Sequence, residues 1–337
     1  MNKSLDEKLA RIRAGTATDR DFILADAKDA DMAFGVAAPG PKRDGSGWKS
    51  LPEYLEQARA IVRQGLVDIM LLSASNLERL TTAEQLFRDS AVTPAARAND
   101  SSDIWLVRGG SYATQPSRPF HSASIDQIKY GRANAEPSRP VAGADLGLYS
   151  VTFTNNLEAD HRTLEAFRAF RDEAESKGFR YFLEVFNPNV ATGIESQAIG
   201  QFLNDHIART LAGVTSRARP LFLKIPYHGP SALEELLSYD PSLVVGIMGG
   251  AAGTTRDAFE LLSESKRHGG RAALFGRKIN LSDHPLAFVE NLRRIASGEI
   301  GPVEGVKAYH DALRQAGVQP ARDLESDLLI TDPALSR

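Results

Sequence analysis

Short apolar runs alternate with amphipathic stretches along most of the chain. In the C-terminal half, three such runs lie within the stretches 220–226, 243–255 and 271–279, and each is followed by a stretch of helical periodicity. Earlier runs of the same kind lie at 32–38, 67–72, 103–108, 146–153 and 180–186. Continuous apolar runs of this length are typical of strands buried on both faces of a parallel sheet. Eight strand–helix units in order, with no G-x-G-x-x-G after the first run, predict a closed TIM (β/α)8 barrel in the α/β class.

The units account for most of the length, so we expect a single domain over residues 1–337. The barrel is expected at about 30–297, after a short N-terminal extension of helices within 4–28, the second of them at 18–28. A C-terminal helix and tail, 298–337, should follow it. Residues 111–143 are rich in Ser, Pro and Ala and predict an elaborated loop over the site.

The composition narrows the class of protein. The 40 basic and 43 acidic side chains give a formal charge of -3, with no long run of either sign, which argues against nucleic acid or an anionic membrane as partner. There are 0 cysteines, which excludes disulfides and thiolate chemistry. No apolar run approaches the ~20 residues that span a bilayer, and the charged N-terminus does not look like a signal peptide. We therefore expect a cytoplasmic protein. The histidines show no metal-ligand spacing, so no metal site and no cofactor are predicted.

Lys224 is the strongest single signal for chemistry. It lies between Phe222, Leu223 and Ile225, inside a strand that should be buried on both faces. A lysine facing the helix layer would be too costly to desolvate, so its side chain should point into the barrel near the strand end, which Pro226 marks. A desolvated lysine amine is a nucleophile able to form a Schiff base with a carbonyl substrate. The structural alternative is a buried ion pair.

Glu184 interrupts an apolar strand in the same way, one strand earlier. It should also point inward, where it can pair with Lys224 or act as general acid or base. Simple neutralisation of Lys224 remains the alternative. Tyr149, in the run before that, is a candidate phenol for proton transfer.

Glycine-rich turns follow the last two predicted strands. In TIM barrels a phosphate often sits between these two loops, because glycines let backbone N–H groups approach an anion. Tight turns alone would also explain them. We expect phosphate contacts from Gly249, Gly250, Gly253, Thr254, Gly276 and Arg277. Ser73 and Arg108, at other predicted strand ends, are weaker binding candidates.

Together these residues resemble a known family. Leu223-Lys224-Ile225-Pro226, Leu183-Glu184-Val185 and the two glycine elements are similar to class I (Schiff-base) aldolases, above all the tagatose-1,6-bisphosphate and archaeal-type fructose-bisphosphate aldolases. The resemblance implies that Lys224 is the Schiff-base lysine, that Glu184 lies beside it, and that Gly249, Gly250, Gly276 and Arg277 bind phosphate. It also implies a phosphorylated sugar as substrate and a homo-oligomer.

One feature departs from that pattern. These aldolases carry an aspartate near the end of the first strand, where this chain has Phe34-Gly-Val-Ala-Ala-Pro39. Asp31 falls at the other end of the predicted strand and Asp44 lies in the loop beyond it. The sequence thus predicts a class I aldolase, a lyase, acting on a specialised sugar phosphate. A phosphosugar isomerase or epimerase, or a non-catalytic phosphosugar-binding barrel, are the alternatives.

Overall fold

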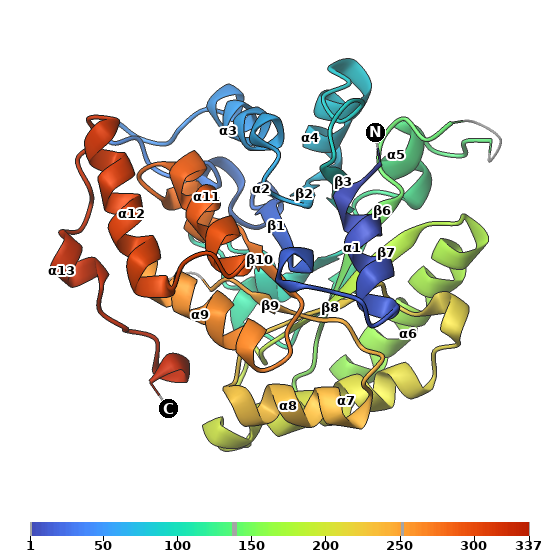
Figure 1. The fold of residues 1–337 in the computed structure, drawn as a ribbon. Coiled ribbons are helices and arrows are strands. Elements are labelled where there is room, and N and C mark those ends of the chain that lie inside the picture. Colours follow the sequence, from blue (N-terminus) through green and yellow to red (C-terminus); the bar gives the residue numbers. More distant parts are fainter. Residues whose placement is uncertain (1, 137–139, 251–252, 337) are drawn as a thin grey trace.

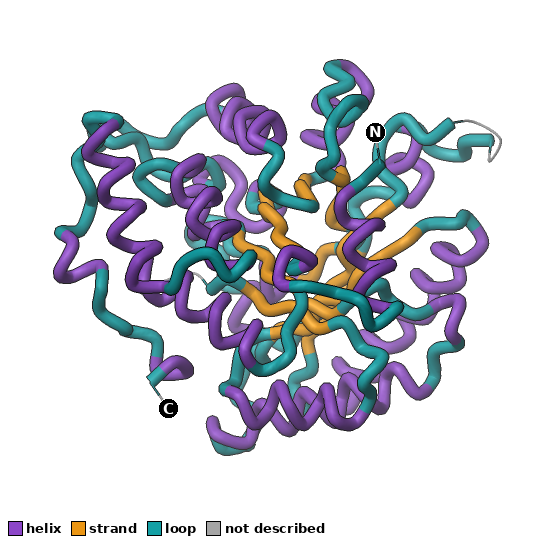
Figure 2. Tube along the Cα trace, viewed as in Figure 1, coloured by secondary structure: helices purple, strands orange, loops and turns teal. Residues whose placement is uncertain are grey.

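A computed structural model describes residues 2–136, 140–250 and 253–336 of the chain. Eight parallel strands close into a barrel in the order β1-β10-β9-β8-β7-β6-β3-β2, surrounded by helices (Figure 1, Figure 2). The barrel strands are β1 Ile23–Lys28, β2 Ile69–Leu72, β3 Thr93–Arg97, β6 Leu146–Thr152, β7 Arg180–Phe186, β8 Leu223–Ile225, β9 Val245–Met248 and β10 Ala272–Phe275. The predicted TIM barrel is confirmed.

The longer helices follow the strands and form the outer layer, and shorter ones lie in the loops. They are α2 Asp31–Phe34, α3 Leu51–Gln64, α4 Ala74–Glu78, α5 Ile125–Tyr130, α6 Leu157–Ser176, α7 Ile199–Ala212, α8 Pro230–Tyr239, α9 Thr255–Arg267, α10 Arg277–Leu281, α11 Pro285–Ala296, α12 Pro302–Gln315 and α13 Leu324–Asp327. A two-stranded sheet outside the barrel pairs β4 Asp100–Ser101 with β5 Pro119–Phe120. None of the helices in these ranges combines the length and apolar character that a bilayer-spanning segment needs.

Two predicted strands were wrong, and one of these errors also misplaced a helix. The run 32–38 forms α2 and a 3-10 turn, and the first barrel strand is instead Ile23–Lys28, where a helix was expected. The run 103–108 is a 3-10 turn and loop, and the third barrel strand is Thr93–Arg97. The barrel therefore begins at Ile23, ahead of the predicted start near residue 30.

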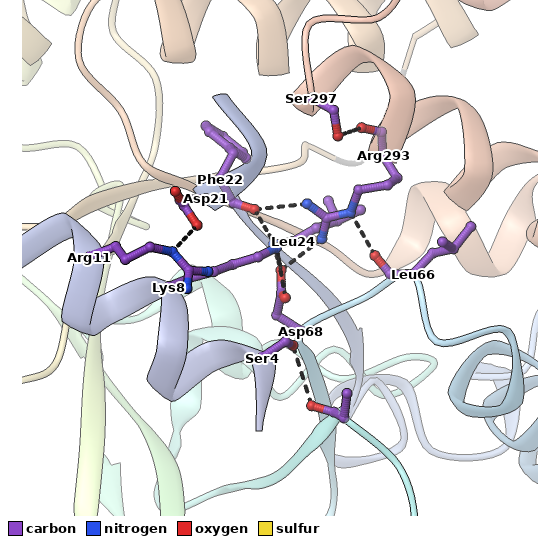
Figure 3. A network of polar contacts seen from close by, with 11 residues as sticks. Ser4, Lys8, Arg11, Asp21, Phe22, Leu24, Leu66, Asp68, Arg293 and Ser297 are labelled. Carbon is purple, nitrogen blue, oxygen red and sulfur yellow. Dashed lines mark hydrogen bonds and ion pairs between the residues drawn. The ribbon is translucent and has the colours of Figure 1, made fainter. Parts of the chain in front are cut away.

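The N-terminal helix α1, Ser4–Arg13, covers the amino-terminal end of the barrel (Figure 1). Its Leu5 and Leu9 are buried among the apolar side chains that fill the barrel interior. A polar network fixes it there (Figure 3). Asp68, just before β2, accepts hydrogen bonds from Lys8 at 2.9 Å and from Arg293 of α11 at 2.7 Å. The helix therefore seals one end of the barrel and leaves the carboxyl ends of the strands for a site.

Candidate active site

A cavity of about 200 Å³ opens at the carboxyl ends of the barrel strands. The strands β1, β3, β7, β8, β9 and β10 contribute residues to it, as expected for an active site in this fold. Its polar lining includes Asp29, Arg97, Glu184 and Lys224. These side chains are nearly inaccessible to solvent, which makes their charges costly unless they are paired.

Lys224 points into the barrel because of the two-residue period of its strand. In β8, Leu223 and Ile225 pack in the helix-facing cluster, so Lys224 between them faces the interior, directly above Phe222. Its Nζ forms an ion pair with Oε1 of Glu184 on the neighbouring strand, where the two residues are register partners. The structure thus brings together the lysine and the glutamate that the sequence singled out.

Glu184 is tied on its other oxygen to a second cation. Its Oε2 accepts a hydrogen bond from the Ser150 hydroxyl at 2.6 Å and from Nη2 of Arg97 at 3.3 Å. Arg97 in turn donates through Nη1 to Ser150 at 2.8 Å and through Nε to Asp29 at 2.6 Å. Although burial alone would lower it, the charges of Asp29 and Glu184 raise the pKa of Arg97 above its usual value. Asp29, Arg97, Ser150, Glu184 and Lys224 therefore form one cluster joined by hydrogen bonds and ion pairs.

Asp29 is an aspartate at the end of the observed first strand, where none was expected from the sequence. It comes directly after Lys28, the last residue of the true first strand, and lines the cavity. The first strand was expected at 32–38, a run that contains no aspartate. This chain does carry a carboxylate at the end of strand one, within hydrogen-bonding distance of the Arg97 guanidinium.

The glycine turns after β9 and β10 border the same cavity. Gly249, Gly250, Gly276 and Arg277 all line it. A Cβ on Gly249 would lie 2.1 Å from the Phe275 ring, and one on Gly276 would lie 2.6 Å from the backbone oxygen of Ala27. A side-chain ring at Gly249 and a backbone carbonyl at Gly276 leave no room for a Cβ, so both positions require glycine.

The start of α9 is less open to an anion than expected. The backbone N–H of Thr254 donates to Asp257 at 2.8 Å, and that of Thr255 donates to Asp327 of the C-terminal segment at 2.7 Å. The Thr254 hydroxyl donates to the carbonyl of Leu329. Because carboxylates of the protein already occupy these donors, Thr254 is a helix cap in this structure. Gly253 borders a neighbouring cavity with Thr254, apart from Lys224.

Three other candidates lie away from the Lys224 cavity. Tyr149 faces outward from β6, where its ring stacks on Phe170 of α6 at 4.3 Å, and burial raises the pKa of its phenol. The Ser73 hydroxyl donates to Asp31 at 2.6 Å. Arg108 is exposed in a loop, with its guanidinium 6.0 Å from the centre of the Trp48 ring. None of the three is among the residues that line the cavity.

Three site residues escaped the sequence analysis: Asp29, Arg97 and Ser150. Arg97 ends a short strand, Thr-Pro-Ala-Ala-Arg, whose composition gives little strand signal. Ser150 could have been found from the sequence. Side chains alternate along a strand, so if Leu146 and Leu148 of β6 face the barrel interior, Ser150 does too, and Tyr149 faces outward.

Comparison with known proteins supports the fold. No protein-family model matches the sequence, and no curated protein matches it at a significant level. Among solved structures, a Schiff-base-forming fructose-1,6-bisphosphate aldolase is similar with a TM-score of 0.61 at 16% identity, over 87% of this chain and 99% of the other. An archaeal fructose-1,6-bisphosphate aldolase, whose catalytic lysine is bound to the carbinolamine intermediate, has a TM-score of 0.61 at 16% identity, over 87% and 100%. Cgl0159 from Corynebacterium glutamicum has a TM-score of 0.58 at 17% identity, over 88% and 98%. At these identities the likeness is one of fold: this chain has the barrel that Schiff-base aldolases have.

Proposed function

We propose that this protein is a metal-independent class I aldolase that cleaves or forms a carbon–carbon bond in a phosphorylated ketose or related sugar derivative. The observation that carries the proposal is the Lys224 amine, which is buried in the cavity and paired with Glu184. The barrel shared with Schiff-base aldolases supports it. The Asp29 carboxylate at the end of strand one adds to the likeness in residues.

In this proposal Lys224 Nζ gives a proton to Glu184 and attacks the ketone carbon of the substrate. The carbinolamine then loses water and becomes an iminium, which draws electrons from the bond to be broken. Asp29 takes the proton of the hydroxyl on the carbon that departs as aldehyde, and the electrons of the carbon–carbon bond form an enamine. Protonation of the enamine and addition of water release the ketone and restore the amine.

The same cavity offers contacts for a phosphate. The backbone N–H groups of Gly250 and Gly276 and the guanidinium of Arg277 are the proposed ligands, because the Gly249 N–H already donates to the Leu274 carbonyl at 2.8 Å. Arg277 lies over the Phe34 ring at 5.8 Å and has no carboxylate among the ion pairs of the described residues. Its charge is therefore available to a ligand.

Borohydride trapping tests the proposal. Protein incubated with dihydroxyacetone phosphate, and then with a panel of ketose phosphates, is reduced and digested for peptide mass analysis. We expect a reduced adduct on Lys224 that is absent in Lys224→Met and present in Lys278→Met, which changes another lysine on the same face of the barrel. Folded protein that forms no adduct with any phosphorylated ketone would refute it.

A further inference from the structure

Three aromatic rings form an exposed cluster on the segment between strands β3 and β6. Trp105, Tyr112 and Phe120, here called the aromatic cluster, are 42%, 43% and 39% exposed. The Trp105 ring stacks on Tyr112 with centroids 4.5 Å apart and lies 5.8 Å from Phe120. Adjacent exposed rings offer apolar surface that a ligand can cover.

The aromatic cluster is joined to the Lys224 cavity through the chain neighbours of Trp105, and the three rings themselves lie outside the lining of that cavity. The residues on either side of Trp105, Ile104 and Leu106, line the cavity that holds Lys224. Phe34 and Phe186 also line it. The polar lining of the cavity includes Lys224 and Glu184, while Ile104, Leu106, Phe34 and Phe186 make another part of its wall apolar.

The segment that carries the rings is held in place by buried polar contacts. Asp103 is 8% exposed and accepts hydrogen bonds from the Ser117 hydroxyl at 2.7 Å and from the Thr152 hydroxyl of β6 at 2.6 Å. The β4–β5 ladder joins the two ends of the segment, at Ser101 and Pro119. The rings are therefore presented by a frame fixed to the barrel.

Two further contacts carry this segment across the mouth of the barrel. The backbone N–H of Leu106 donates to the carbonyl of Ala33, after strand β1, at 2.9 Å. On the other side, the Asn189 amide after strand β7 donates to the carbonyls of Ala113 and Gln115 at 2.9 and 2.6 Å. The segment thus runs from the loop after β1 to the loop after β7, beside any substrate that reaches Lys224.

We propose that the aromatic cluster is a specificity subsite that takes an apolar substituent on one of the two carbonyl fragments joined at Lys224. This inference rests on the proposed function and narrows its substrate class. A polyhydroxylated chain finds few hydrogen-bond partners on this wall, whereas a hydrocarbon group buries the exposed ring surface and gains about 25 cal/mol for each Å² removed from water.

Binding is tested first, without any imine. The chain has 2 tryptophans, so Trp48→Phe leaves Trp105 as the sole reporter. In Trp48→Phe/Lys224→Met, titration with cyclohexanemethanol should change Trp105 fluorescence saturably, and glycerol at the same concentrations should not. Equal responses to both alcohols, or none to either, would overturn the inference.

Activity is tested next, as the ratio of kcat/KM for addition of dihydroxyacetone phosphate to cyclohexanecarboxaldehyde and to glyceraldehyde. We expect a ratio above one, and a fall of about tenfold in Trp105→Ala, the size of one aromatic contact. Tyr239→Ala is the matched control, because Tyr239 is 68% exposed at the end of α8 and outside the cavity lining. An unchanged ratio in Trp105→Ala would overturn the inference. A lower mass of that variant in sedimentation, with the ratio unchanged, would assign the cluster to a contact between copies instead.

The two proposals fail separately. Saturable binding of cyclohexanemethanol without any imine on Lys224 supports the subsite and refutes the aldolase. Imine formation with no preference for the apolar aldehyde supports the aldolase and refutes the subsite.

Discussion

Replacing Arg97 by Met should destabilise the protein more than any surface ion-pair change. Arg97 is 6% exposed and is the one residue that donates a hydrogen bond to the Asp29 carboxylate within the described ranges. Glu184 would keep Lys224 and Ser150 as partners, but Asp29 would become a buried charge without compensation.

The magnitude follows from these contacts. Removing one partner of a buried ion pair costs about 3–5 kcal/mol. The neutral double variant Arg97→Met/Asp29→Asn no longer buries the uncompensated charge, so it should recover at least about 1 kcal/mol of that loss. Arg180→Met is the control, because Arg180 pairs with Asp6 and Asp145 in a partly exposed site and should cost at most about 1 kcal/mol.

Urea denaturation at pH 7, followed by far-ultraviolet circular dichroism, measures the free energy of unfolding of the wild type and of each of the three variants. Borohydride trapping on the folded variants, with the ketone that labels the wild type, reports whether the cluster also holds Lys224 in a reactive position. The reasoning is refuted if Arg97→Met loses less than about 1 kcal/mol. It is equally refuted if the double variant is no more stable than the single one.

Three further predictions concern positions away from that cluster. Burial raises the pKa of Asp26, which is paired with Lys28 at 3.2 Å, to about 6. Since this lies above the unfolded value, the folded state binds the proton more tightly, and the contribution of Asp26 to stability falls by about 3 kcal/mol as pH rises from about 4 to about 7. Urea titrations across that range should show this slope disappearing in Asp26→Asn/Lys28→Met, and a slope that persists would contradict the assignment. Gly276→Ala should cost about 1–3 kcal/mol, because its Cβ would lie 2.6 Å from the carbonyl oxygen of Ala27; an unchanged thermal midpoint would show that the turn can relax. Leu5→Ala should cost about 2–5 kcal/mol in urea titrations, because Leu5 is fully buried at the base of the barrel, and a loss below about 1 kcal/mol would mean that α1 is not an essential seal.

Strands with strong apolar character were readable from the sequence, and those without it were not. The run 180–186 is β7 at the same bounds, and Glu184 and Lys224 stood out as charges inside such runs. Ile23–Lys28 carries Asp26 and Lys28 on its helix-facing side, where a barrel strand is normally apolar, so it looked helical. Because the first strand was not recognised at Ile23–Lys28, Asp29 was not identified as a residue at a strand end.

The contacts between strands were the second feature that could not be predicted from the sequence. A sequence does not give register, so the bonds that join Arg97, Ser150 and Glu184 were invisible until the strands were aligned side by side. The use of the α9 N-terminus by Asp327 depends on a segment more than sixty residues away in the chain, and nothing local signals it.

Because β1 pairs with β10, the barrel can close only after its last strand has been synthesised. Ile23 pairs with Ala272, so the first strand waits for the last before the barrel closes. Until the ribosome has released β10, one edge of β1 has no neighbour, and the apolar interior under α1 is incomplete. Contacts of such long sequence separation form slowly and leave partly built sheets prone to aggregation. Lys224 and Glu184 therefore acquire their closed surroundings only after β10 has been synthesised.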